Sequence, residues 1–242
     1  MVESIHHGAV IVCDLQGRYR HAWGNPGWVV PPRSALKPFQ AIALVESGAA
    51  DAFGLTSEHI ALACASHQAQ DFQVALVRDW LAKLGLDDSA LVCGPALPAA
   101  VSDQGTAWAN GGPGRVYHNC SGKHCGFLTV SRHLGAGLDY ANPAHPAQKL
   151  YMDILSEFIG QDASKLPRAI DGCGLPAIAM PLGAMARATA KLGVGWAKTP
   201  ARRAAIRRVL DAMLAHPDHL AGRDEPVARL LRFCDGNVIA KG

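Results

Sequence analysis

The sequence lacks the long apolar runs that mark membrane proteins. None of its 242 residues belong to a segment with the roughly 18 uninterrupted apolar residues of a spanning helix. The apolar stretch 177–188 is short, and Pro181 interrupts it. Residues 1–7 are polar, with no basic region leading into an apolar one, so they do not resemble a signal peptide. These absences predict a cytoplasmic protein without a membrane partner.

Charge is also scarce. Charged residues make up 18% of the chain, below the average of about 25% for soluble domains, and the net charge is only +3. No long run of Lys or Arg occurs. The one basic cluster, at Arg202, Arg203, Arg207 and Arg208, has helical spacing, which is typical of a solvated helix face rather than a nucleic-acid footprint. No nucleic-acid partner is therefore expected.

The cysteines do not have the pattern of a disulfide framework or of a zinc finger. Their number is odd, and no two stand in a C-x-x-C pair. Most are expected to be small buried hydrophobes. Cys120, Cys125 and Cys173 differ from the rest because glycine and polar residues surround them. The seven cysteines are Cys13, Cys64, Cys93, Cys120, Cys125, Cys173 and Cys234.

Hydrophobic periodicity and turn residues predict an α/β fold. Strands are expected at 8–13 and 19–23 around a turn at 14–17, and a buried strand at 60–63, after a short capped helix that begins near 56, is expected to lead into Ser66. Ser34 is expected to cap a helix over 35–47, which Gly48 ends. Further helices are expected at 72–84, 123–133, 146–160 and 201–216, with loops filling 93–114.

The segment 118–126, His-Asn-Cys-Ser-Gly-Lys-His-Cys-Gly, carries the most chemistry. It holds two thiols, two imidazoles, an amine and a hydroxyl, with two glycines that let the backbone approach a ligand. Cys120-x-x-Lys123 together with Cys173 offers two thiolates and a nitrogen, which suit zinc with a fourth position for water. Lysine must lose its proton to bind, so His118, His124 and Cys125 are conventional alternative ligands. A packed segment without metal is the competing interpretation.

Two serine motifs suggest nucleophilic catalysis. Ser34-x-x-Lys37 at a helix start places both side chains on one face, where a lysine with a lowered pKa can take the serine proton. The alternative is a capping serine beside an exposed lysine. Ser66-His67 follows the expected strand, and strand ends in α/β folds commonly carry functional groups. Its alternative is a turn serine with a packed histidine.

Taken in chain order, four motifs and the N-terminal segment resemble the Rhizobium-type L-asparaginases, the asparaginase II family. The resemblance covers essentially the whole chain and implies one catalytic domain over 1–242 that hydrolyses L-asparagine to L-aspartate and ammonia. It also implies a fold like that of serine β-lactamases and glutaminases, in which an antiparallel-rich sheet is flanked by helices and joined to a helical subdomain. The motifs are Val2-Glu3-Ser4-x-His6-x-Gly8, Arg33-Ser34-x-x-Lys37-Pro38, Cys64-x-Ser66-His67, His118 to His124, and Asp171-Gly172-Cys173-Gly174-x-Pro176.

The resemblance also assigns roles residue by residue. It implies that Ser34 is the nucleophile with Lys37 as its base, and that Ser66 and Lys241 form a second pair that relays protons. An amino-acid substrate needs a carboxylate for its ammonium and a cation for its carboxylate, which Asp171 and Arg33 would supply. The implied zinc ligands are Cys120, Lys123 and Cys173, and the implied substrate-site residues are Arg33, His67, Ser121, Gly122, His124, Asp171 and Gly174. A homodimer is the default expectation.

The resemblance implies that the family pattern continues beyond Gly242 with closing strands of the sheet. We therefore expect either a protein shortened at its C-terminus or a remaining part that lies outside this chain. For this chain alone we expect a poorly anchored Lys241, an exposed sheet edge, and reduced activity and stability. Two other functions compete with asparagine hydrolysis. A penicillin-recognising serine hydrolase shares the serine–lysine chemistry, but the chain has no S-D-N and no K-T-G motif. A non-catalytic paralogue would bind an amino acid or zinc without turnover.

Overall fold

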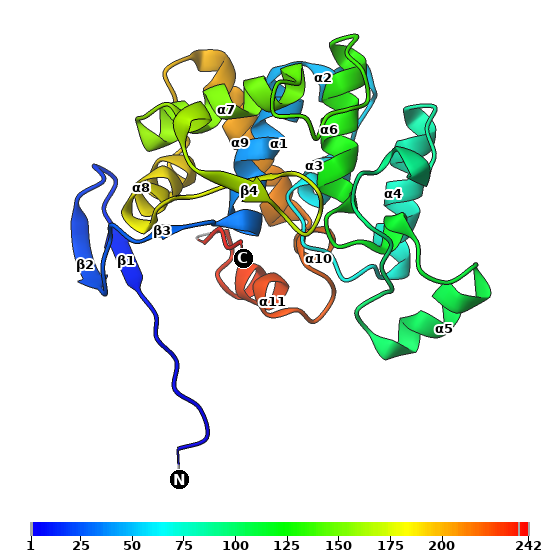
Figure 1. Ribbon diagram of the computed structural model, residues 1–242, viewed down its shortest axis with the longest axis horizontal. Helices are drawn as coiled ribbons and strands as arrows, with labels where there is room; N and C mark the ends of the chain where they lie inside the picture. Colours follow the sequence, from blue (N-terminus) through cyan, green and yellow to red (C-terminus); the bar gives the residue numbers. More distant parts are fainter. Residues whose placement is uncertain (1, 237, 242) are drawn as a thin grey trace.

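The computed structural model describes residues 2–236 and 238–241, which form a mixed α/β structure (Figure 1). The predicted α/β class is therefore confirmed. Its α-helices are α1 (Lys37–Glu46), α2 (Ala49–Ala52), α3 (Ser57–Ala63), α4 (Asp71–Lys83), α5 (Val101–Ala109), α6 (Ser121–His133), α7 (Pro146–Ile159), α8 (Leu182–Gly193), α9 (Pro200–Ala215), α10 (Pro217–Leu220) and α11 (Pro226–Phe233). Its strands are β1 (Val10–Cys13), β2 (Tyr19–Trp23), β3 (Val29–Val30), β4 (Arg168–Ile170), β5 (Pro176–Ile178) and β6 (Met180–Pro181). Its 3₁₀ turns are η1 (Arg33–Leu36), η2 (Asp88–Ala90), η3 (Arg115–Tyr117) and η4 (Ala163–Lys165).

Helices α1, α3, α6, α7 and α9 form the core, with α1 at its centre (Figure 1). Helix α1 contacts the other four, and eight of its ten residues are buried. A helix that is apolar around most of its circumference gains stability only when neighbours cover every side. Phe39 meets Phe158 of α7 edge to face at 4.9 Å, and Gly48 ends the helical segment with φ +80°. The core therefore fixes the position of Lys37, in the first turn of α1.

The described strands form three separate antiparallel pairs, β1–β2, β3–β6 and β4–β5. The β1–β2 hairpin stands at one side of the helical body, and the β4–β5 hairpin crosses in front of it (Figure 1). The turn between β4 and β5 holds the Asp171 to Gly174 motif, closed by Gly174 N–H donating to Asp171 O at 2.8 Å. The expected single sheet is thus not seen in the described residues. The serine β-lactamase-like fold stays a prediction.

Most helix and strand predictions are confirmed within a few residues, and three local expectations are wrong. Residues 60–63 belong to helix α3, because a short run that is apolar on every side fits a buried helix as well as a strand. Leu36, rather than Ser34, is the N-cap of α1, and no side chain caps that helix. The loop region 93–114 contains α5, whose side chains are mostly exposed and so have little apolar periodicity.

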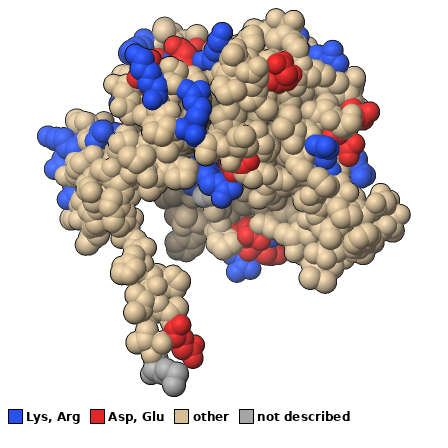
Figure 2. Space-filling model, in the orientation of Figure 1, with Lys and Arg blue, Asp and Glu red and all other residues tan. Residues whose placement is uncertain are grey.

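The charge pattern is as expected except at one arginine. Lys and Arg are interspersed with Asp and Glu over the face shown in Figure 2. Within the described residues, no helix combines the length and apolarity needed to cross a membrane. Arg202, expected on a solvated helix face, is buried and pairs with Glu46, Asp153 and Glu157 at 2.8, 3.0 and 2.6 Å. This ion-pair network joins α9 to α1 and α7, so the expected solvated face is wrong for this residue.

Candidate active site

The hydroxyl of Ser66 lies between two lysine amines. Lys37 Nζ is 3.1 Å from Ser66 Oγ, and Lys241 Nζ is 2.9 Å from the same oxygen. Lys37 Nζ also donates to the carbonyl oxygen of Ala65, just beyond the C-terminal end of α3. A serine hydroxyl has one hydrogen and two lone pairs, so it can donate to one amine while it accepts from the other. The three side chains therefore form a continuous path for a proton.

Burial lowers the pKa of both lysines. Lys37 is only 1% exposed, and the loss of hydration around its ammonium is the main cause of its lowered pKa. The pKa of Lys241 falls to about 7, first because the amine is buried and then because the positive charge of Lys37 repels its proton. At that pKa, Lys241 is partly unprotonated near neutral pH and is able to accept a proton from a hydroxyl. Burial shifts the pKa of Lys37 in the same direction.

Ser34 is half-buried in η1, where its carbonyl oxygen accepts the backbone N–H of Lys37. Its hydroxyl makes no hydrogen bond to another residue in the described part of the chain. The expected Ser34–Lys37 side-chain pair is thus adjacent in sequence, but the lysine amine is directed to Ser66 and Ala65. Arg33, immediately before, has φ 47°, a left-handed conformation that is uncommon outside glycine and sets the direction of the chain at this serine.

The three expected metal ligands come together although 50 positions in the sequence separate Lys123 from Cys173. Lys123 Nζ lies 3.0 Å from Cys173 Sγ, and Cys120 is hydrogen-bonded to Cys173. That bond lowers the pKa of the Cys120 thiol against the effect of burial, and it raises the pKa of Cys173 together with burial. Two sulfur atoms and one nitrogen converge here, a donor set that suits zinc. In the described residues, no cluster of three or more His, Cys, Asp or Glu side chains is placed to hold a metal.

The two residues expected to bind the substrate's charged groups bind each other. The guanidinium of Arg33 donates to Asp171 Oδ1 from Nε at 3.0 Å and from the terminal nitrogen at 2.6 Å. The backbone N–H of Gly172 donates to the same oxygen at 2.6 Å. The Arg33 side chain is exposed, so this pair costs little to separate. The β4–β5 turn thus places a carboxylate and a guanidinium together, near the start of η1.

His67 and Ser121 are buried and bonded to the protein itself. His67 Nδ1 accepts the backbone N–H of Ala69 at 3.1 Å, so its Nε2 carries the hydrogen and donates to Ser121 Oγ at 2.8 Å. Ser121 Oγ in turn donates to the carbonyl oxygen of Val116 at 3.1 Å. Burial lowers the pKa of His67 to about 3, so the ring is neutral. These hydrogen bonds hold the backbone next to Ser66 in place. Substrate contacts by His67 and Ser121 stay a prediction.

His124 is also enclosed. Its Nδ1 lies 2.8 Å from the hydroxyl of Tyr140, which accepts the backbone N–H of Val92 at 2.8 Å. Its Nε2 is buried with no hydrogen-bond partner in the described residues. Val92 also abuts Gly174, where φ is +84° and a side chain would approach Val92 within 2.7 Å. Tyr140 therefore links helix α6 to the segment against which the β4–β5 turn packs.

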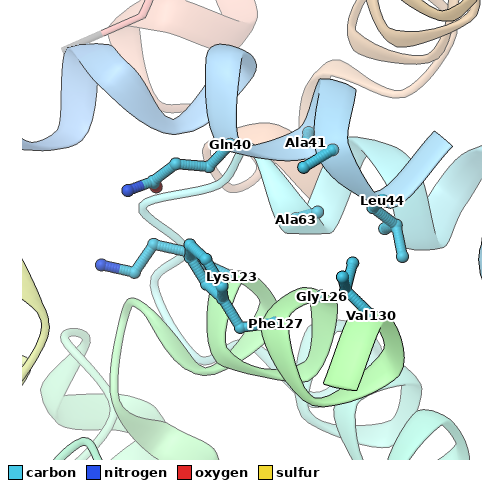
Figure 3. Close-up of a pocket in the computed structure, with 9 residues that line it drawn as sticks. Gln40, Ala41, Leu44, Ala63, Lys123, Gly126, Phe127 and Val130 are labelled. Atoms are coloured by element: carbon cyan, nitrogen blue, oxygen red, sulfur yellow. The ribbon is translucent and has the colours of Figure 1, made fainter. Parts of the chain in front are cut away.

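Glycine at 122 allows α6 to pack against α3. A Cβ atom there would collide with the carbonyl oxygen and side chain of Leu62. One helical turn after Gly122, at Gly126, a cavity of about 10 Å³ lies between α1 and α6 and has room for one water (Figure 3). Gln40 and Lys123 extend their polar ends to the same side of this cavity (Figure 3). The oxygen Oε1 of Gln40 is buried and lacks a partner among the described residues.

A larger cavity, of about 350 Å³, reaches Ser66 from the side of the 118–126 segment. This volume is in the range of small-molecule sites. Sequence reasoning did not assign Gln68, His118 and Asn119 to the substrate site, although they line this cavity. Only the polar character of the motif pointed to His118 and Asn119, and nothing in the sequence distinguished Gln68. The complete lining is Ser66, His67, Gln68, Ala96, Leu97, Ala99, Tyr117, His118 and Asn119.

Comparison with known proteins agrees with the resemblance drawn from the motifs. The model of the family described as L-asparaginase II matches residues 1–242, the whole chain. No curated protein matches the chain. A match over the full length includes both serine motifs, the 118–126 segment and the β4–β5 turn, which the structure gathers on one side of α1. The chain belongs to the L-asparaginase II family.

Proposed function

We propose that this protein hydrolyses L-asparagine to L-aspartate and ammonia by serine–lysine catalysis. The observation that carries the proposal is the bridge of Ser66 Oγ between Lys37 Nζ and Lys241 Nζ, at 3.1 and 2.9 Å. A carboxamide resists attack unless a hydroxyl is activated and the departing nitrogen receives a proton. A hydroxyl between two lysine amines can move protons in both directions. The family match supports asparagine as the substrate.

In this proposal Ser34 is the nucleophile. Its hydroxyl takes no part in capping α1, and it stands three residues before Lys37. Attack on the carboxamide carbon transfers the Ser34 proton to Lys37. That proton then passes through Ser66 and Lys241 to the amide nitrogen, and collapse of the tetrahedral intermediate breaks the C–N bond and releases ammonia. Water then hydrolyses the ester on Ser34, giving L-aspartate and restoring the serine. Two lysines of low pKa suit this sequence, because one amine must accept a proton while its neighbour donates one.

Arg33 and Asp171 would recognise the two charges of the amino acid. The substrate carboxylate would bind the guanidinium of Arg33, and the substrate ammonium would bind the carboxylate of Asp171. The ion pair between Arg33 and Asp171 would thus be replaced by two ion pairs with the substrate. An exposed ion pair contributes only about 0–1 kcal/mol to stability, so breaking the Arg33–Asp171 pair to bind the substrate costs little free energy. This arrangement favours a free α-amino acid over a peptide, which lacks one or both charges.

Cys120, Lys123 and Cys173 would hold zinc in the same proposal. The fit rests on convergence of two sulfurs and one amine, with Lys123 Nζ 3.0 Å from Cys173 Sγ. When bound, zinc supplies a Lewis acid that polarises a carbonyl oxygen, or a structural link between α6 and the β4–β5 turn. Lys123 would then be neutral, with its two N–H groups available for acceptors such as Oε1 of Gln40, which has no partner among the described residues.

The test is ammonia release from L-asparagine by the purified protein, with Ser34→Ala and Ser66→Ala beside the wild type. We expect Ser34→Ala to abolish turnover and to form no acyl adduct by mass spectrometry of acid-quenched protein. Ser66→Ala should turn over slowly and still carry an adduct of the aspartyl group on Ser34. An adduct on Ser66 would reverse the two serine roles. No ammonia from zinc-loaded wild type would overturn the proposed function.

A further inference from the structure

The segment that follows Ser66 has no regular secondary structure, and bonds to other parts of the chain hold its backbone. The N–H of Gln68 donates to Gln73 Oε1 at 3.2 Å, and its carbonyl oxygen accepts the N–H of Ala99 at 3.0 Å. Ala69 has φ 59°, a left-handed conformation that persists only where the surroundings enforce it. The position of this segment therefore depends on its outside partners.

The side chain of Gln73 joins this segment to helix α10. Gln73 lies in the first turn of α4, is 0% exposed, and uses both ends of its amide. Its oxygen accepts the N–H groups of Gln68 and Gln70 at 3.2 and 3.1 Å, and its Nε2 donates to the carbonyl oxygen of Asp218 at 2.8 Å. An apolar side chain here would leave buried backbone groups without partners.

The chain after α10 is tied to the same segment at two further points. Gln70 Oε1 accepts the N–H of Arg223, in the loop between α10 and α11, at 2.9 Å. Gly222 lies against the side chain of Gln68, where an added Cβ atom would come within 2.9 Å of Cγ. The start of α4 therefore holds the α10–α11 region against the residues that follow Ser66.

Helix α11 continues this connection toward Lys241. Helices α10 and α11 are in contact, and the guanidinium of Arg232 in α11 donates to the carboxylate of Asp218 in α10 (Figure 1). Eight positions after α11 ends, Lys241 Nζ lies 2.9 Å from Ser66 Oγ. The two side chains of this bond are thus also connected through the buried amide of Gln73 and the α10–α11 pair.

We propose that Gln73 is a positioning residue that holds Ser66 and Lys241 against each other. It acts through the backbone on both sides of their hydrogen bond and touches neither side chain. This inference rests on the proposed function, in which Ser66 and Lys241 pass protons. A proton passes between two groups only while they stay within hydrogen-bond reach, so the rigidity of this link contributes to turnover.

The substitution Gln73→Met isolates this effect, because it keeps the length of the side chain, removes both polar ends and changes no charge. The groups whose charges act on the pKa of Lys241 all remain in the variant, so a changed titration of Lys241 reports a changed position of its amine. Those groups are Lys37, Cys64, Cys120 and Lys123. The matched control is Thr199→Ala, which removes the side-chain cap of α9, an acceptor for the N–H of Arg202 at 3.2 Å.

The measurements are the melting temperature and the pH dependence of kcat and KM for ammonia release, below both melting transitions. We expect Gln73→Met to melt roughly 2–8 °C lower, and its kcat midpoint to rise about one pH unit above the wild-type value near 7, because Lys241 loses part of its burial. At pH 7 its kcat should fall about tenfold with little change in KM, and the loss should be smaller at pH 9.

The control separates positioning from general destabilisation. Thr199→Ala should melt roughly 2–4 °C lower and keep the wild-type kcat and pH midpoint. Wild-type kcat in Gln73→Met at pH 7, or a loss that is equal at pH 7 and pH 9, would overturn the proposal.

A milder variant covers the case in which Gln73→Met does not fold. Gln70→Met removes the acceptor for the N–H of Arg223 and leaves Gln73 in place. We expect its kcat midpoint to rise by less than that of Gln73→Met. If only this variant folds, a wild-type midpoint in Gln70→Met overturns the proposal.

A readout without turnover keeps this test distinct from that of the proposed function. If the wild type releases no ammonia, that function fails, and ¹³C NMR titration of lysine-labelled protein then decides, with the resonance of Lys241 assigned by Lys241→Met. A higher midpoint for Lys241 in Gln73→Met than in the wild type supports the positioning role. Equal midpoints in the two proteins overturn it.

Discussion

A lysine as deeply buried as Lys37 is stable only when its charge is removed or compensated. Burying an isolated ammonium costs so much that the group normally loses its proton instead. Two of its hydrogen-bond partners, Ala65 O and Ser66 Oγ, are neutral acceptors. The Cys120 side chain also bonds to the amine and favours its charged form, but burial is the larger effect and lowers the pKa of Lys37 overall. The same burial that would destabilise a charged lysine therefore favours the neutral amine, which is the form that can accept a proton from a serine. Burial is thus the main cause of both the shift of Lys37 toward its neutral form and its capacity to act as a base.

The first residue-scale prediction concerns Lys37. Lys37→Met keeps the buried volume and removes the amine, so we expect turnover to fall by about 10²–10⁴-fold while the melting temperature is unchanged or raised. Lys37→Arg should lose as much turnover, because arginine stays protonated, and should also melt lower. Ammonia release and thermal unfolding measure the two effects. An arginine variant with more than a tenth of wild-type turnover would show that only positive charge is needed here.

The second residue-scale prediction concerns the pH dependence of Lys241. Its pKa is about 7 in the folded protein against 10.5 for the free group, so the unfolded chain binds more protons between these values. Folding stability should therefore rise as pH increases from about 7 to 10.5, and turnover should rise through about pH 7 as the amine loses its proton. The groups that shift this pKa through their charge are Lys37, Cys64, Cys120 and Lys123.

Lys241→Met tests the assignment of both pH effects. The variant should lose the rise in stability over that pH range, measured as urea unfolding free energy, and most of its turnover. Below pH 6, Lys241 is charged in both the folded and the unfolded wild type, so the unfolding free energies of variant and wild type should change with pH in parallel there. A wild-type stability curve that stays flat from pH 7 to 10 would contradict the low pKa of this lysine.

At the scale of elements, the close packing of α6 against α3 positions the 118–126 motif. The only sign of this packing in the sequence is the glycine at 122. The spacing of apolar residues predicted helix α6, and the motif glycines predicted a close approach to something. The partner is the carbonyl end of α3 at Leu62, which no local pattern identifies. Helix α3 itself was expected to end in a strand, because four apolar residues fit either structure until their neighbours are known.

Gly122 and Gly126 form a matched pair for testing this packing. A Cβ at Gly122 meets the backbone of Leu62, which cannot move aside, so Gly122→Ala should destabilise the protein by about 1–3 kcal/mol. A Cβ at Gly126 meets Ala63 and Leu44 at 3.7 and 3.8 Å, which are ordinary contacts, so Gly126→Ala should stabilise by about 0.5–1 kcal/mol. Urea unfolding with unchanged m-values measures both. Equal effects of the same sign would refute the contact between α3 and α6.

Across the whole molecule, the site depends on joining segments that are remote in the chain, and sequence reasoning reached only part of this. The motifs predicted that residues near 34, 66, 120 and 171 belong together, and the structure gathers them around α1 and α6. The resemblance also implied the Ser66–Lys241 pair, whose side chains lie 2.9 Å apart. Nothing in the sequence predicted that Lys37 would contact Ser66 as well, or that Arg202 would be a buried link between helices. Both depend on three-dimensional packing of several helices. The expected homodimer stays a prediction.

The final prediction concerns zinc as a link between these remote parts. Cys120 and Lys123 belong to the start of α6, whereas Cys173 lies on the β4–β5 turn, so a metal bound to all three would join two elements that the described structure connects through few contacts. Cys120→Ser and Cys173→Ser should therefore bind no zinc, and Cys125→Ala, a buried thiol outside the set, should bind it normally. A metal held at 1,000 times its Kd stabilises by about 4 kcal/mol, so chelation should lower the melting temperature of the wild type by roughly 10 °C. The same chelator should leave Cys173→Ser unchanged. Metal analysis that finds no zinc in wild-type protein, as purified or after zinc is added, would remove the metal from the proposed site and leave the Lys123–Cys173 contact as a hydrogen bond alone.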